Sequence, residues 1–293
     1  MRTLVILTLC LVVLLVGGLS VLAFWPLPAP VAVATVEGDA KRGAYLARLS
    51  GCVACHTASG KPSFSGGSAL VSPFGSFFAP NLTPDPQAGI GDWTFSQFVR
   101  AMRQGISPSG QPYYPAFPYE FYTTLTDRDL ADLWAALQAL PPVETPSQTH
   151  AVGFPFNVRE GLKLWKSAFE QPATYLPVAS KSKAWNLGSY IVNGPAHCGA
   201  CHTPRNVAGG LSPESALAGD PAMMDGGRSP PITPKTLRER GYTKESLISM
   251  LRTGILPDGD AVGGSMVEVV HGSTKFLLTE HLNGVATYLL DLE

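Results

Sequence analysis

Two short segments of identical spacing constrain this chain more than any other feature. Residues 52–56 read Cys-Val-Ala-Cys-His and residues 198–202 read Cys-Gly-Ala-Cys-His, so both have the form C-x-x-C-H that attaches c-type haem. The spacing follows from the chemistry, because two thiols add across the two vinyl groups of one porphyrin and the adjacent histidine reaches the iron. We expect two covalently bound haem c groups, with thiol attachment at Cys52, Cys55, Cys198 and Cys201 and proximal iron ligation by His56 and His202.

Three other uses of paired cysteines compete with haem attachment. A thioredoxin-like redox pair would follow a strand, whereas a helical pattern precedes each pair here. A four-cysteine zinc site would join pairs about 15 to 20 residues apart, whereas 142 residues separate Cys55 from Cys198. Structural disulfides stay open for an exported protein, although they would not require a histidine after each pair.

The sequence around the two motifs repeats itself, which supports the haem interpretation. Gly-Ala-Tyr-Leu at residues 43–46 precedes the first motif, and Gly-Ser-Tyr-Ile at residues 188–191 precedes the second. Further along, residues 103–110 match residues 252–259, and in both copies an amphipathic helix runs into a glycine, which is a normal helix stop. Each copy therefore has the order of elements of a small cytochrome c domain.

Each copy also closes with a predicted helix, over residues 126–140 in the first and 279–292 in the second. We expect an all-α fold of two tandem cytochrome c-type domains. The predicted boundaries are 37–145 for the first domain, 146–182 for an interdomain linker and 183–293 for the second domain.

The residue expected on the other face of each iron differs between the copies. Twelve residues after the glycine that ends the helix of the second copy lies Met266, in a predicted loop, and its thioether is a natural iron ligand. We expect His202 and Met266 to bind the second iron. The same count in the first copy reaches Phe117, which cannot bind iron. The first iron is then open or otherwise ligated, with Met102 and His150 as the weaker candidates.

The amino-terminal segment is long and apolar. Residues 4–25 carry no charge over 22 positions, and about 20 apolar residues suffice to cross a bilayer as a helix. Trp25 and the prolines that follow it resemble an interfacial anchor leading into a stiff spacer. We assign residues 1–36 to a membrane anchor with a Pro-rich spacer, and keep a cleaved signal segment as the alternative. Either interpretation places the body of the protein outside the cytoplasm.

Composition narrows the class of protein further. Charged residues make up 15% of the chain, against about 25% in soluble domains, so part of the surface is expected to be covered by a membrane, a cofactor or a partner. Lys and Arg number 21 against 22 for Asp and Glu, which argues against a nucleic-acid-binding protein.

Several longer segments resemble the multihaem cytochrome c subunits of bacterial membrane-bound alcohol, gluconate and aldehyde dehydrogenases and their two-haem periplasmic relatives. The resemblance covers most of residues 38–293. It rests on Gly51 to Thr57, Asn81-Leu82-Thr83-Pro84-Asp85, Gly89 to Trp93, Tyr114 to Tyr119, Leu140-Pro141-Pro142-Val143, Phe154 to Arg159, and Cys198 to Asn206.

This resemblance implies electron transfer rather than catalysis on a substrate. The donor would be a dehydrogenase subunit, the acceptor a quinone, another cytochrome or an oxidase, and the location the periplasmic side of the bacterial inner membrane. Two features depart from the family: its dehydrogenase subunits commonly hold three haem motifs, and many members have methionine where Phe117 stands. An open first iron also keeps a second hypothesis, a dihaem enzyme of the thiosulfate-oxidising or peroxidase-like type.

Overall fold

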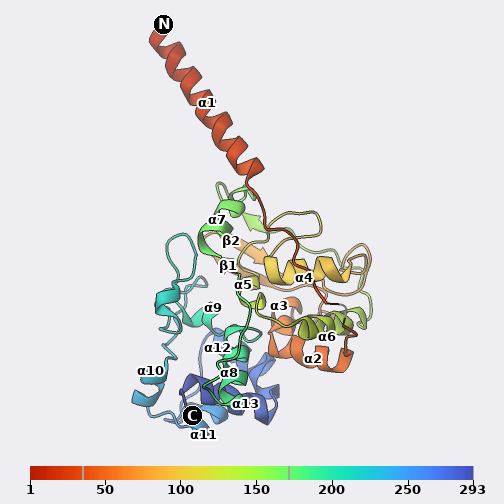
Figure 1. Cartoon of the computed structure of the whole chain (residues 1–293), viewed down its shortest axis with the longest axis vertical. Coiled ribbons are helices and arrows are strands. Elements are labelled where there is room, and N and C mark those ends of the chain that lie inside the picture. Colours follow the sequence, from red (N-terminus) through yellow and green to blue (C-terminus); the bar gives the residue numbers. More distant parts are fainter. Residues whose placement is uncertain (35, 171, 293) are drawn as a thin grey trace.

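The computed structural model describes residues 1–292 except residues 35 and 171, and it leaves the side chains of residues 14–16, 19 and 23 undescribed. The chain begins with a single long helix, α1 (Arg2–Phe24), which projects away from the body of the molecule (Figure 1). As far as the structure describes the chain, it contains no helix with the length and apolar character needed to cross a membrane.

The first half of the body is built around two helices that cross at close range. Asp39 caps the first of them, and Thr126 caps the second by accepting a hydrogen bond from the Asp129 N–H at 3.1 Å. Gly43 permits the close approach, because a Cβ there would lie 1.8 Å from the Asp132 carbonyl oxygen. The helices of this half are α2 (Ala40–Leu49), α3 (Cys52–His56), α4 (Phe95–Gln104), α5 (Tyr119–Tyr122) and α6 (Asp127–Gln138), with α2 packed on α6.

The second half repeats this arrangement with its own elements. Gly188 takes the place of Gly43, since a Cβ at Gly188 would lie 1.9 Å from the Gly284 carbonyl oxygen of the facing helix. The elements are α8 (Lys183–Asn193), α9 (Gly199–His202), η1 (Pro213–Ser215), α10 (Pro234–Glu239), α11 (Lys244–Thr253), α12 (Ser265–Gly272), η2 (Thr274–Phe276) and α13 (Thr279–Leu289), with α8 packed on α13. The predicted glycine stops are confirmed, because Gly105 and Gly254 cap α4 and α11 in the left-handed conformation.

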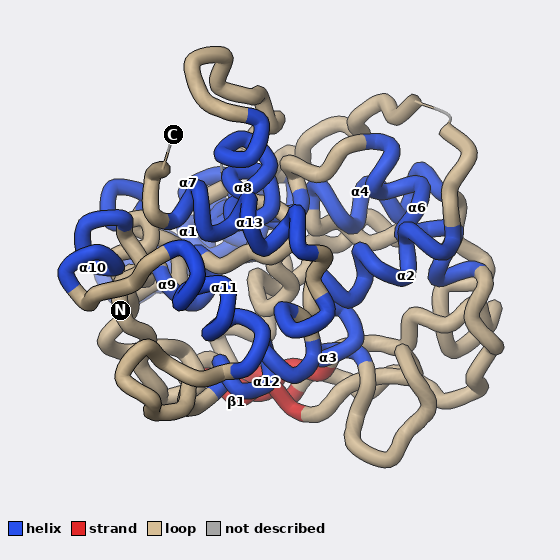
Figure 2. Tube along the Cα trace, turned by 90° about the horizontal axis from the view of Figure 1, so that it is seen from below, coloured by secondary structure: helices blue, strands red, loops and turns tan. Residues whose placement is uncertain are grey.

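The two halves lie side by side, and each has its own hydrophobic core cluster. Figure 2 shows α2, α4 and α6 on one side and α10, α11 and α13 on the other, with α3 and α12 between them. Tyr45 of α2 and Tyr190 of α8 pack against both clusters. The two cores are therefore joined by apolar contacts across the interface.

The prediction of an all-α chain is wrong in one region. Strands β1 (Ala69–Ser72), β2 (Gly75–Phe78) and β3 (Ala151–Val152) form a small antiparallel sheet in the order β1-β2-β3. Gly75, with φ of 135°, makes the tight turn between the first two strands. The third strand and the helix α7 (Gly161–Phe169) both come from residues 146–182, so this segment folds against the first half instead of forming a bare connection.

Candidate functional site

The first C-x-x-C-H motif forms one short helix directly after α2. Gly51 precedes it in the left-handed conformation, with φ of 68°, and redirects the chain into α3. Residues three and four positions apart lie on the same face of a helix. Cys52, Cys55 and His56 are therefore presented together, as attachment of one flat group by two thiols and one imidazole requires.

His56 is held in the state that an iron ligand needs. Its Nδ1 donates a hydrogen bond to the Pro80 carbonyl oxygen at 2.7 Å, which leaves the Nε2 lone pair for a metal. Burial lowers the pKa of His56 to about 4, only partly opposed by this hydrogen bond, so the imidazole is neutral near pH 7. A neutral, oriented imidazole is the form in which histidine binds iron.

The second motif has the same construction. His202 ends α9 and donates from Nδ1 to the Pro230 carbonyl oxygen, again at 2.7 Å. Burial lowers the pKa of His202 as well. His56 and His202 thus donate to the same kind of acceptor, a proline carbonyl oxygen, at the same distance. The repeat is therefore one of geometry as well as of sequence.

A cavity of about 510 Å³ opens beside the first motif. Cys52, Cys55 and His56 line it together with apolar and aromatic side chains, among them Ile90, Trp93, Phe98, Met102, Phe117 and Tyr122. Burial raises the pKa of the Cys52 thiol to about 12. An apolar, roomy site with a few converging polar groups is typical of a cofactor site. The residues present fit a porphyrin attached at the motif.

In the described residues neither Cys52 and Cys55 nor Cys198 and Cys201 form a disulfide. Cys10 is exposed on α1. Cys198 packs against the core cluster of the second half, and burial raises its pKa to about 12, as in the first motif. Burial thus acts in the same way on the first cysteine of each motif.

The structure places the candidates for the sixth iron ligand in different surroundings. Met266 packs against the same core cluster as Cys198, but it lies in the first turn of α12 and not in the predicted loop. Gly264, with φ of 57°, caps this helix, which begins at Ser265, so Met266 is its second residue and the loop prediction is wrong. Phe117 lines the first cavity, where the repeat places it.

Met102 and His150 also line the first cavity. Met102 is buried in α4 within the core cluster of the first half, as expected for a core side chain. His150 accepts a hydrogen bond at Nδ1 from the Phe78 N–H at 3.2 Å, and its ring contacts Phe77 and Tyr114. His150 lies beside the sheet because β3, which directly follows it, pairs with β2. The sequence did not reveal this pairing.

Two features of the sites were missed at the level of sequence. The carbonyl groups of Pro80 and Pro230 orient the two histidines, and Asn81 fixes the first of these loops by donating to the Val143 carbonyl oxygen at 2.7 Å. The Asn-Leu-Thr-Pro segment after Pro80 was the available signal. His197 is interpreted from the sequence as a surface or haem-edge residue, and the structure places it in the wall of the first cavity although it directly precedes the second motif.

Arg205, which the sequence places beside the second motif, has protein partners. Its guanidinium lies 3.5 Å from the Glu120 carboxylate of α5 and donates to the Gly209 carbonyl oxygen at 2.8 Å. The residue therefore joins the two halves by an ion pair.

Comparison with known proteins agrees with this geometry. The cytochrome c family model matches residues 40–141. A protein named "Diheme cytochrome c-type" from Cereibacter sphaeroides is 38% identical over 265 residues, which cover 89% of this chain and 88% of that protein. This chain belongs to the multihaem cytochrome c family. As a cytochrome c with two attachment motifs, it has two covalently bound haem c groups as its cofactors.

Longer relatives of this cytochrome c include named dehydrogenase components. The fructose dehydrogenase cytochrome subunit of Gluconobacter japonicus is 36% identical over 281 residues, which cover 94% of this chain and 57% of that subunit. A nicotinate dehydrogenase component of Pseudomonas putida is 37% identical over 254 residues, covering 86% of this chain. The chain spans 21% of that protein's length, so it matches a part of these relatives and not the whole.

Proposed function

We propose that this cytochrome c is an electron-transfer subunit that takes electrons from a dehydrogenase and passes them to a respiratory acceptor. The observation that carries the proposal is the duplicated site, in which a neutral histidine is oriented by a proline carbonyl beside two thiols. Relatives named as cytochrome subunits of dehydrogenases support a dehydrogenase as donor. A quinone, another cytochrome or an oxidase is the proposed acceptor. The comparisons do not favour the dihaem-enzyme hypothesis.

The proposed assignment of roles follows the two motifs. Cys52 and Cys55 hold the first haem with His56 as proximal ligand, and Cys198 and Cys201 hold the second with His202. Met266 is the proposed sixth ligand of the second iron. Bound haem supplies reversible one-electron chemistry, and the surrounding chain contributes orientation, burial and exclusion of water.

We also propose an arrangement of domains along the chain. Residues 37–145 and 183–293 would be tandem cytochrome c-type domains, with 146–182 as the linker, supported by the two core clusters and the matching α2–α6 and α8–α13 pairs. Residues 1–36 would anchor the protein to the bacterial inner membrane with the haem domains in the periplasm. The exposed leucines and valines along α1 support this anchor. A variant without residues 1–36, exported by a cleavable signal, should leave the membrane fraction.

Mass spectrometry tests the cofactor assignment directly. Protein matured with a working haem-attachment system should show a mass increase of two haems, and Cys198→Ala with Cys201→Ala should reduce it to one. Reduction of the purified protein by a dehydrogenase, but not by thiosulfate, is the expected functional result. Turnover of thiosulfate or peroxide would contradict the electron-transfer role.

A further inference from the structure

His197 stands directly before Cys198, yet it lines the cavity of the first motif. A Cβ placed on Gly51 would lie 3.6 Å from His197 Cε1. Gly51 directly precedes Cys52, so the two residues that come immediately before each motif lie against each other. The second half of the chain thereby contributes a side chain to the first site, at the end where Cys52 attaches.

The His197 ring is held in place and is not a loose surface group. Its Nδ1 donates to the Pro195 carbonyl oxygen at 3.0 Å, and its backbone has φ of 38°. The Tyr122 ring stands edge-on to it, with centroids 5.7 Å apart and planes at 80°. The Tyr122 hydroxyl in turn donates to the Ser50 carbonyl oxygen at 2.9 Å. Tyr122 therefore links the His197 ring to the turn just before the first motif.

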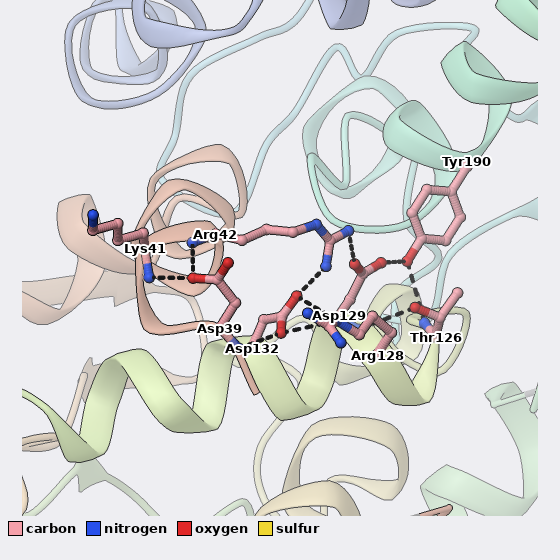
Figure 3. Close-up of polar contacts among 8 residues, drawn as sticks. All are labelled: Asp39, Lys41, Arg42, Thr126, Arg128, Asp129, Asp132 and Tyr190. Atoms are coloured by element: carbon pink, nitrogen blue, oxygen red, sulfur yellow. Dashed lines mark hydrogen bonds and ion pairs between the residues drawn. The ribbon is translucent and has the colours of Figure 1, made fainter. Parts of the chain in front are cut away.

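A polar network keeps the two halves in this relation (Figure 3). The Tyr190 hydroxyl of α8 donates to the Asp129 carboxylate of α6 and accepts from the Thr126 N–H at 3.2 Å. Arg42 of α2 pairs with the same carboxylate and with Asp132. Because Asp129 and Asp132 are 2% and 0% exposed, this network is anchored in the interior of the first half.

The first motif also meets an element of the second half across the interface. A Cβ on Gly272 of α12 would lie 3.4 Å from the Ala54 Cβ, between the two cysteines of the first motif. The second half of the chain therefore lies against the first motif at Ala54 as well as at Gly51.

We propose that His197 is a positioning residue of the first haem site: it covers the edge next to Cys52 and keeps water from it, so the second half of the chain raises the reduction potential of the first haem. This inference rests on the proposed attachment of haem at Cys52 and Cys55. The physical reason is that water at the edge of the group stabilises the more highly charged ferric state, whereas burial favours the ferrous state.

Redox titration of the full-length dihaem protein tests the role, with four variants. His197→Ala removes the cover and should lower the midpoint potential of the first haem alone. His197→Asn should lower it too, because asparagine tolerates positive φ but is shorter than the imidazole ring. His197→Phe keeps an aromatic cover and should retain a midpoint close to that of the parent. His271→Ala is the matched control, since His271 is exposed on α12.

Two further variants identify which midpoint belongs to which haem. Phe117→Met alters a wall of the first cavity, and Met266→His alters the proposed ligand of the second iron, so each marks one site. A pyridine haemochrome assay showing two haems per chain in every variant establishes that the proposed attachment holds, separately from the role of His197. The inference is overturned if His197→Ala and His197→Asn leave the first midpoint unchanged, or if His197→Phe lowers it equally.

Discussion

Phe117 is the residue that makes the two haem sites unequal. It lies in the wall of the first cavity, and its ring contacts Tyr113, Tyr119 and Tyr122 without offering a lone pair to iron. Met266 offers a thioether in the corresponding segment of the second half. The different chemistry of these two side chains, on otherwise repeated scaffolds, predicts different behaviour toward small ligands.

Carbon monoxide provides the test of this difference. We expect the ferrous first haem to bind carbon monoxide, because no sixth side chain competes for the iron, while the second haem resists it. Visible spectra of the reduced protein should show conversion of about half of the haem, and Phe117→Met should abolish that conversion. Spectra with no carbon monoxide complex would contradict an open first iron. A gain of binding in Met102→Ala would then identify Met102 as the ligand.

Helix packing is decided by two glycines, one at each crossing. A Cβ at Gly43 would lie 1.8 Å from a carbonyl oxygen of α6, which is a clash with backbone and not with a movable side chain. The neighbouring helix must therefore shift to admit even a methyl group.

Gly43→Ala should lower the free energy of unfolding by about 1–3 kcal/mol through this overpacking. Gly161→Ala is the matched control, since a Cβ at Gly161 at the start of α7 meets no atom within 4 Å. Urea unfolding followed by far-ultraviolet circular dichroism measures both. Equal stability of the two variants would show that α2 and α6 adjust without cost.

The α2–α6 pair also contains a buried carboxylate whose charge stabilises the fold. Burial by itself would raise the pKa of Asp132, but hydrogen bonds from the Asp39 N–H and from Arg42 outweigh it and lower the pKa. A carboxyl group with a lowered folded pKa stabilises the protein above its unfolded pKa of about 4, and this contribution is lost as pH falls below that value.

Asp132→Asn should lower stability near pH 7 by about 2 kcal/mol, because charged hydrogen-bond partners lose their counter-charge. The difference between variant and parent should shrink as the pH is lowered through about 4 toward about 2, where the parent carboxyl becomes protonated. Denaturant unfolding at a series of pH values checks this. A difference that stays constant with pH would mean that the charge of Asp132 contributes nothing.

At the scale of the whole molecule, polar contacts join the two halves. Tyr190 joins α8 to the Asp129 carboxylate and to the Thr126 N–H, and Tyr45 contacts His281 Nδ1 at 2.5 Å. Arg205 and Glu120 add an ion pair between the halves. These contacts join the half that contains His197 to the half that contains the first motif.

Tyr190→Phe should destabilise the protein by about 1–2 kcal/mol, because it removes one partner of a buried carboxylate. Tyr288→Phe is the control, since the hydrogen bond that the Tyr288 hydroxyl makes within the described residues, accepted from Asn193, is exposed. This change should alter stability by less than about 0.5 kcal/mol. Thermal unfolding monitored at the haem absorbance distinguishes them. Identical unfolding temperatures for the two variants would show that the Tyr190 hydroxyl does not stabilise the interface.

The local features of this chain could be predicted from its sequence. The C-x-x-C-H spacing determined the cofactor, and the positions of Thr126, Gly105 and Gly254 determined where helices begin and end. The reason is physical: capping and covalent attachment involve residues only a few positions apart, so a short segment contains all the atoms that decide them.

Only the tertiary structure decided what depends on contacts between distant segments. Three features fall in this class: the pairing of β3 with β2, the ion pair of Arg205 with Glu120, and the place of His197 in the first site. Each depends on surfaces that meet only after both cores have formed. No local sequence pattern specifies such a meeting, because the partner residues lie tens to hundreds of positions away.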